Sequence, residues 1–202
     1  MTINLSIESL VDILSIVIST FLALHFLTLW KGNRKANLLL GLFMLQCAIG
    51  VFVTQWESFF HDKINPSLFL IPITSPFALM PILYFYATYL TGESKEKRRK
   101  RRWILIPLAA EVLLRATFFF SANAMGLDRE FYWHYIYWTN YISIPFSLLI
   151  LVLMIGLIKR HNNNLLNLFS SLEDKKLNWL RALVFIHLFL MESGLLMIAW
   201  LP

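Results

Sequence analysis

Six long apolar stretches divide this chain, and its Lys and Arg residues are concentrated in alternate gaps between them. The stretches span residues 10–30, 36–56, 68–90, 103–120, 141–158 and 179–201. Each is about as long as a helix must be to cross a hydrocarbon core of ~30 Å. The pattern predicts an all-α, polytopic integral membrane bundle with six transmembrane helices.

The charges in the gaps predict how these helices are oriented. Of the eighteen Lys and Arg residues, fifteen lie in the first, third and fifth gaps or at the start of the sixth stretch. The second and fourth gaps contain only Lys63 and Arg129, and Arg115 lies inside the fourth stretch. Because short loops rich in Lys and Arg remain in the cytoplasm, we expect the N-terminus outside and the three basic gaps inside.

Gap length and composition limit the domain organisation. The longest gap, residues 159–178, is too short for a soluble domain, so we expect a single transmembrane bundle over residues 1–202. Hydrophobic residues make up 58% of the chain and charged residues only 15%, which excludes a water-soluble globule. Residues 169–181 contain a capping-box pattern, which predicts a cytoplasmic helical elbow before the sixth stretch.

Residues that commonly carry catalysis or bind metals are sparse and scattered. The five histidines lie in different stretches and gaps without metal-ligand spacing, and the single cysteine, Cys47, excludes an intramolecular disulfide. The sequence contains no metalloprotease, serine-hydrolase or phosphate-loop motif. We therefore expect no metal site, no cofactor and no enzymatic activity.

Ionisable residues inside the apolar stretches are the main candidates for a functional site. Glu111 and Arg115 are four residues apart and share one helical face. In the sixth stretch, His187 lies at about the depth of Glu111 and Glu192 at about the depth of Arg115, so these pairs can meet if the two helices are neighbours. A charge at the bilayer centre costs at least ~2.5 kcal/mol, so we expect these groups to be paired. Two interpretations stay open. One is a polar pocket for a ligand or a proton relay, and the other is a structural ion pair within the fourth stretch.

The third gap contains a run of seven cations between two membrane stretches. We expect this loop to contact anionic lipid headgroups rather than nucleic acid, because both of its ends are held at the membrane. The residues concerned are Lys95, Lys97, Arg98, Arg99, Lys100, Arg101 and Arg102.

Two further patterns lie toward the predicted outer face. Residues 131–138 (FYWHYIYW) indicate either an interfacial aromatic belt or the rim of an external ligand site. The third stretch contains Pro72, Pro76 and Pro81, which predict a kinked helix lining an outward-facing cavity or ordinary irregularity near the interface.

Three runs of the sequence resemble the membrane half of the bacterial membrane-bound transcription regulators of AraC type. The runs are residues 33–50 (NRKANLLLGLFMLQCAIG), 83–93 (LYFYATYLTGE) and 169–181 (FSSLEDKKLNWLR). In that family a bundle of seven helices precedes a cytoplasmic helix-turn-helix domain, and related bundles precede histidine kinase modules. The resemblance covers about residues 30–200. This sequence departs from the family in having six stretches, no seventh helix and no DNA-binding domain.

The resemblance implies a sensory or signal-input module in the bacterial inner membrane, lacking its seventh helix and output domain. Expected partners are a bilayer with anionic headgroups and a stimulus that the sequence does not name. We expect no direct nucleic-acid binding, and homodimerisation stays open. Two alternatives remain: a small transporter with Glu111, Arg115 and Glu192 along its polar path, and an intramembrane lipid-modifying enzyme with Glu192 or His187 as base.

Overall fold

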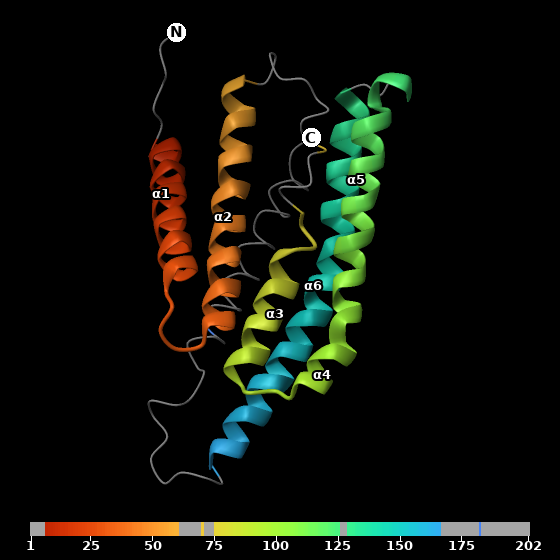
Figure 1. Ribbon diagram of the computed structural model, residues 1–202. Helices are drawn as coiled ribbons and strands as arrows, with labels where there is room; N and C mark the ends of the chain where they lie inside the picture. Colours follow the sequence, from red (N-terminus) through yellow and green to blue (C-terminus); the bar gives the residue numbers. More distant parts are fainter. Residues whose placement is uncertain (1–6, 61–69, 71–74, 126–128, 167–181, 183–202) are drawn as a thin grey trace. The chain divides into compact units, whose positions relative to one another are not determined.

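The computed structural model describes residues 7–60, 70, 75–125, 129–166 and 182 (Figure 1). In this part of the chain the regular structure is helical and contains no strand, which confirms the all-α class there. The elements are α1 (Ile7–Thr28), α2 (Arg34–Phe60), α3 (Leu79–Leu90), α4 (Lys95–Lys100), the 3-10 helix η2 (Arg101–Leu105), α5 (Ile106–Met125) and α6 (Arg129–Leu166).

Four helical segments of the described residues are long and apolar enough to cross a membrane. They are Ser9–Thr28, Arg34–Val53, Lys95–Ser121 and Glu130–Asn164, with α3 as a shorter apolar helix. These segments correspond to the first, second, fourth and fifth predicted stretches. The sixth stretch and the helical elbow of residues 169–181 lie outside the described residues. The count of six helices and their orientation therefore stay predictions.

The chain divides into two compact units, Met1–Ile150 and Leu151–Pro202, with the boundary inside α6. In the first unit α1 packs against α2, and α2 packs against α3 (Figure 1). The connection between α1 and α2 is short and turns at Gly32, whose φ is +78°. Asn33 then caps α2, because its Oδ1 accepts a hydrogen bond from the Ala36 amide at 3.3 Å. The two helices are therefore antiparallel neighbours.

The interface between α1 and α2 depends on small residues. A Cβ atom at Gly41 would lie 2.8 Å from the Leu27 Cγ and 3.2 Å from the Ala23 carbonyl oxygen, so the backbones approach closely there. On the opposite side of α1, Phe21 is 70% exposed and Val17 is 58% exposed. Such an apolar outer face is what a helix in contact with lipid requires.

Helix α3 is shorter than the third predicted stretch, residues 68–90. It begins at Leu79, and the preceding segment forms a turn in which the Ser75 carbonyl accepts a hydrogen bond from the Ala78 amide at 3.0 Å. Pro76 lies within this turn and Pro81 in the first helical turn, where a missing amide costs no internal hydrogen bond. Pro72 lies outside the described residues. Prolines therefore delay the start of α3.

The basic run in the third gap is helical, although its composition predicts a loop. Ser94 caps α4 by accepting a hydrogen bond from the Lys97 amide at 3.5 Å, and Glu96 lies in the first turn. Helix α4 continues through η2 into α5 without a non-helical residue. The run is therefore the first part of one long helical segment, residues 95–125.

Helix α6 is longer than the fifth predicted stretch, residues 141–158. It begins at Arg129 and includes the aromatic run 131–138, which therefore lies on a helix. No Gly or Pro interrupts residues 129–144, and Pro145 is accommodated inside the helix. The stacked and edge-to-face rings of Tyr137, Trp138 and Tyr141 are half-exposed on its surface.

Candidate functional site

A buried ion pair within α5 is the main polar feature of the first unit. The Arg115 Nε donates a hydrogen bond to the Glu111 Oε1, and each side chain is only 4% exposed. The two residues are four positions apart, so both project from one face of the helix. The opposite face of α5 is apolar, with Leu113 67% exposed and Phe120 84% exposed. The pair therefore lies on the side of α5 that faces the protein.

An aromatic cluster of α5 and α6 lies beside the ion pair. The Arg115 Cζ lies 5.8 Å from the centroid of the Tyr135 ring, which belongs to α6. Phe118 packs edge-on against both Tyr135, at 5.5 Å between centroids, and Phe131, at 5.1 Å. Burial in apolar surroundings lowers the local dielectric constant, which strengthens the attraction between the two charges.

Two polar atoms of this cluster have no hydrogen-bond partner among the described residues. They are the Glu111 Oε2 and the Tyr135 Oη, both buried. The carboxylate oxygen can accept a hydrogen bond, and the phenol can donate one or accept one. The cluster of Glu111, Arg115 and Tyr135 can therefore bind a water molecule or respond to a change of charge. It contains no nucleophile poised beside a base.

The other predicted members of the site are His187 and Glu192, and both lie outside the described residues. Their pairing with Glu111 and Arg115 stays a prediction. Sequence reasoning missed Tyr135, which it treated only as part of an aromatic run. Its spacing of three from Tyr132, which is also buried, could have indicated an inward-facing stripe on α6.

The basic end of the first unit contains a second polar cluster, at the junction of α3 and α4. The Arg101 Nη2 lies 3.4 Å from the Glu93 Oε1, and the Arg101 guanidinium also donates a hydrogen bond to the Tyr84 Oη. The Glu93 side chain is only 7% exposed. Gly92, with φ +66°, ends α3 and lets the Glu93 amide donate a hydrogen bond to the Thr88 carbonyl at 3.1 Å. This turn brings Glu93 within reach of Arg101.

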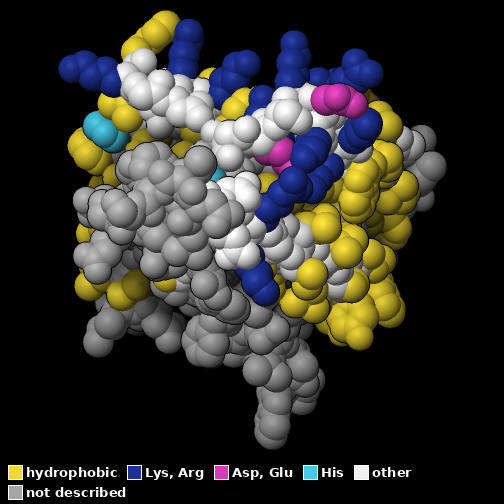
Figure 2. All heavy atoms as spheres, turned by 90° about the horizontal axis from the view of Figure 1, so that it is seen from below, with side chains coloured by type: hydrophobic (Ala, Val, Ile, Leu, Met, Phe, Trp, Pro, Cys, Tyr) yellow, Lys and Arg dark blue, Asp and Glu magenta, His cyan; other side chains and the backbone are white. Residues whose placement is uncertain are grey.

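The seven cations expected at lipid headgroups divide into two groups. Arg98 and Arg101 turn toward α3, since Arg98 donates a hydrogen bond to the Glu93 carbonyl and lies over the Tyr89 ring at 4.4 Å. The other five are exposed: Lys95, Lys97, Arg99, Lys100 and Arg102. Figure 2 views the end at which the α1–α2 and α3–α4 connections lie, and Lys and Arg side chains gather on it.

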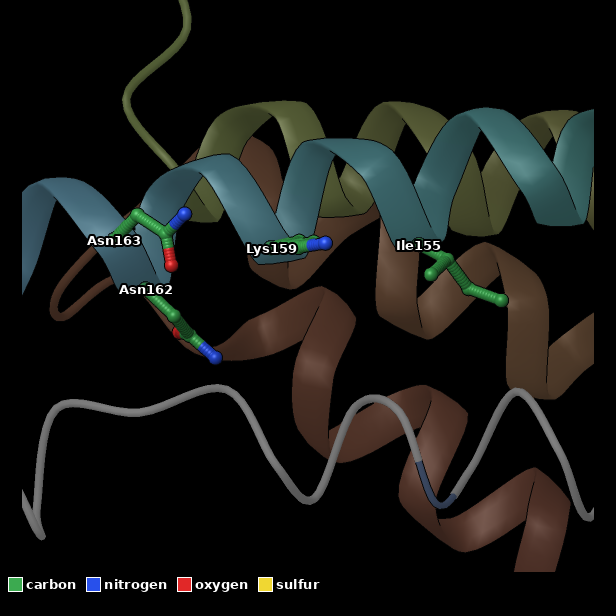
Figure 3. Close-up of a pocket in the computed structure, with 4 residues that line it drawn as sticks. All are labelled: Ile155, Lys159, Asn162 and Asn163. Atoms are coloured by element: carbon green, nitrogen blue, oxygen red, sulfur yellow. The ribbon is translucent and has the colours of Figure 1, made fainter.

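The second unit contains a hollow of about 420 Å³ on one face of α6. Its described lining residues are Ile155, Lys159, Asn162 and Asn163 (Figure 3). Their spacing of four, three and one places them along a single helical stripe. The described part of this lining offers two amide groups and one ammonium group as hydrogen-bonding partners.

The described residues contain no group of three or more His, Cys, Asp and Glu side chains that could hold a metal ion. Comparison with protein-family models, with curated proteins and with solved structures found no match. The fold and the site define a class: a helical protein whose apolar segments are long enough to cross a membrane and one of which contains a buried ion pair. The resemblance to AraC-type regulators rests on the three sequence runs.

Proposed function

We propose that this chain is the membrane-embedded signal-input module of a bacterial transcription regulator or sensor kinase. One observation supports the proposal most directly. The buried Glu111–Arg115 pair and the Arg101 contacts with Glu93 and Tyr84 lie on the same uninterrupted helical segment, residues 95–125. One continuous helical segment, which includes the 3-10 helix η2, thus joins a polar cluster inside the bundle to a polar cluster at its basic end.

The segment can transmit a displacement over a useful distance. Arg115 follows Arg101 by fourteen positions, which corresponds to roughly 20 Å along a helix. A stimulus that changes charge or hydration beside Arg115 would shift α5 against Tyr135. Because Arg101 moves with the same segment, its contacts with α3 would change in response. The resemblance to membrane-bound regulators supports the same role.

The transporter alternative would use Glu111, Arg115 and Glu192 as a polar path. The Glu111 and Arg115 side chains are engaged with each other on one helix and are 4% exposed, which favours a fixed structural element over an open path. The lipid-modifying enzyme rests on His187 and Glu192, which lie outside the described residues. The signal-input function is therefore the one that the described geometry supports best.

A distance measurement tests the coupling between the two polar clusters. Spin labels would be attached at cysteines replacing the exposed Lys31 and Lys97, in a Cys47→Ala background in lipid nanodiscs. Arg115→Met removes the buried charge, and we expect it to shift the distance distribution between the labels. Leu114→Met, on the half-exposed side of the same turn, is the matched control and should leave the distribution unchanged. Identical distributions for both variants would contradict the proposal.

Proton flux separates the transporter from the signal-input module. Liposomes loaded with a pH-sensitive dye would carry the wild-type chain or Glu111→Gln. We expect the same proton leak from both, because Glu111 is paired with Arg115 rather than used as a carrier. A leak that depends on Glu111 would favour the transporter.

A further inference from the structure

Two basic segments that are distant in the sequence meet at the ring of Tyr89, near the end of α3. The Lys35 Nζ, from the first turn of α2, lies 5.9 Å from the ring centroid. The Arg98 Cζ, from α4, lies 4.4 Å from the same centroid. The Asn33 Nδ2 donates a hydrogen bond to the Tyr89 carbonyl at 2.9 Å, so the start of α2 is fixed to this turn of α3. The cations are therefore brought together by tertiary structure.

The charge of these segments is not balanced within them. Residues 31–35 and 93–102 contain ten cations and two acids, Glu93 and Glu96. Both carboxylates are already in ion pairs, Glu93 with Arg101 at 3.4 Å and Glu96 with Lys100 at 3.0 Å. The other eight cations have no carboxylate left in these segments, and such a concentration of one sign of charge attracts an anionic partner.

Tryptophans place this charge at the level of a membrane surface. Trp30 is 71% exposed, and the Arg34 Cζ lies 3.9 Å from the centroid of its ring. Trp103 is 45% exposed, and Ile106, three positions further along the chain, is 63% exposed. Exposed Trp residues between charged and apolar surface are typical of the headgroup region of a bilayer. An anion that is available at this level is the phosphate of a phospholipid.

We propose that the phosphate of an anionic phospholipid binds between Lys35 and Arg98 beside Tyr89; we call this the Tyr89 site. The ammonium of Lys35 and the guanidinium of Arg98 supply charge and hydrogen-bond donors, and the positive end of the α2 dipole adds to the attraction. The acyl chains lie along the apolar surface of the adjoining helices. Lipid binding at the Tyr89 site does not depend on the signal-input function.

The Tyr89 site differs from general attraction of basic loops to anionic lipid. In general attraction each exposed Lys or Arg contributes about equally. In the Tyr89 site, the Asn33 hydrogen bond fixes the first turn of α2, which carries Lys35, beside Tyr89, and Arg98 donates a hydrogen bond to the Glu93 carbonyl. The replacement of Lys35 and Arg98 should therefore reduce lipid selectivity more than the replacement of two other cations.

Lipid selectivity can be measured with the full chain in phosphatidylcholine bilayers that contain spin-labelled phosphatidylglycerol. The site variant is Lys35→Gln with Arg98→Gln, and the matched control is Lys95→Gln with Arg99→Gln, which removes the same charge from exposed positions. We expect the selectivity for phosphatidylglycerol over phosphatidylcholine to be at least about fivefold lower in the site variant than in the control variant. Equal losses in the two variants would show general attraction only and overturn the proposal.

Further variants separate binding of lipid from loss of folding and from binding of free anions. Lys35→Arg with Arg98→Lys keeps both charges and should retain most of the selectivity. If the double Gln variant fails to fold, as judged by helix content, Lys35→Gln alone is compared with Lys95→Gln. Inorganic phosphate at millimolar concentration should not displace the labelled lipid. Displacement by phosphate would identify the site as one for free anions and overturn the assignment to phospholipid.

Discussion

At the scale of single residues, the Glu111–Arg115 pair shows how two charges can be accommodated in an apolar helical segment. Burial removes both groups from water, and their mutual attraction compensates only while both are present. Lys100 and Glu96 form a second ion pair with the same four-position separation in the sequence. The Lys100 Nζ lies 3.0 Å from the Glu96 Oε1, but both side chains are 74% exposed. Both are ion pairs between a glutamate and a cationic side chain one helical turn away, and they differ in burial.

Removing one partner of the buried pair should be costly. We expect Arg115→Met to lower the free energy of unfolding by about 3–5 kcal/mol, because it leaves the Glu111 carboxylate buried and unpaired. Adding Glu111→Gln should recover part of the loss if these two are the partners. Thermal unfolding in detergent measures both effects. Recovery with Glu192→Gln instead would show that the sixth stretch supplies the partner.

The exposed pair provides the control for that comparison. Lys100→Met should change the free energy of unfolding by less than about 1 kcal/mol, since solvent screens an exposed pair. If Lys100→Met lowered the free energy of unfolding as much as Arg115→Met does, burial would not explain the cost of removing Arg115.

At the scale of elements, close packing of α1 on α2 depends on the absence of a side chain at Gly41. We expect Gly41→Val to destabilise the protein by about 1–3 kcal/mol, because a Cβ there would lie 2.8 Å from the Leu27 Cγ. Gly50→Val is the matched control in the same helix, where a Cβ would meet nothing within 4 Å. Equal unfolding midpoints for the two variants, measured in detergent, would count against this close approach.

The elements also show how far sequence reasoning reaches. Length and hydropathy predict α1, α2, α5 and the apolar part of α6, because crossing a membrane requires about twenty apolar residues. They do not predict where α3 begins, since a turn at Ser75 and two prolines decide that locally. They also treat residues 95–100 as a loop, because the cations adjacent there repel one another. The Ser94 cap and the continuation into η2 make this segment helical.

For the candidate site, the sequence predicts the contact within one helix but not the contacts between helices. The four-residue separation of Glu111 and Arg115 predicts a shared face, and the structure joins them. Their neighbour Tyr135 is harder to select, because hydrophobicity does not identify the inward face of a helix that is apolar on all sides. Its spacing of three from Tyr132 is the one sequence signal for that face, and Tyr is common at exposed positions as well.

At the scale of the whole molecule, we predict an integral membrane protein whose basic connections face the cytoplasm. The structure places the first and third gaps at the same end of the first unit, since Asn33 in the first gap contacts Tyr89 beside the third gap. The most direct test is labelling of single cysteines in intact cells with a membrane-impermeant thiol reagent, after Cys47→Ala. Cysteines replacing Ser94 and Asn163 should be protected, and cysteines replacing Asn65 and Ala124 should be labelled. Labelling at Ser94 from outside would contradict this prediction.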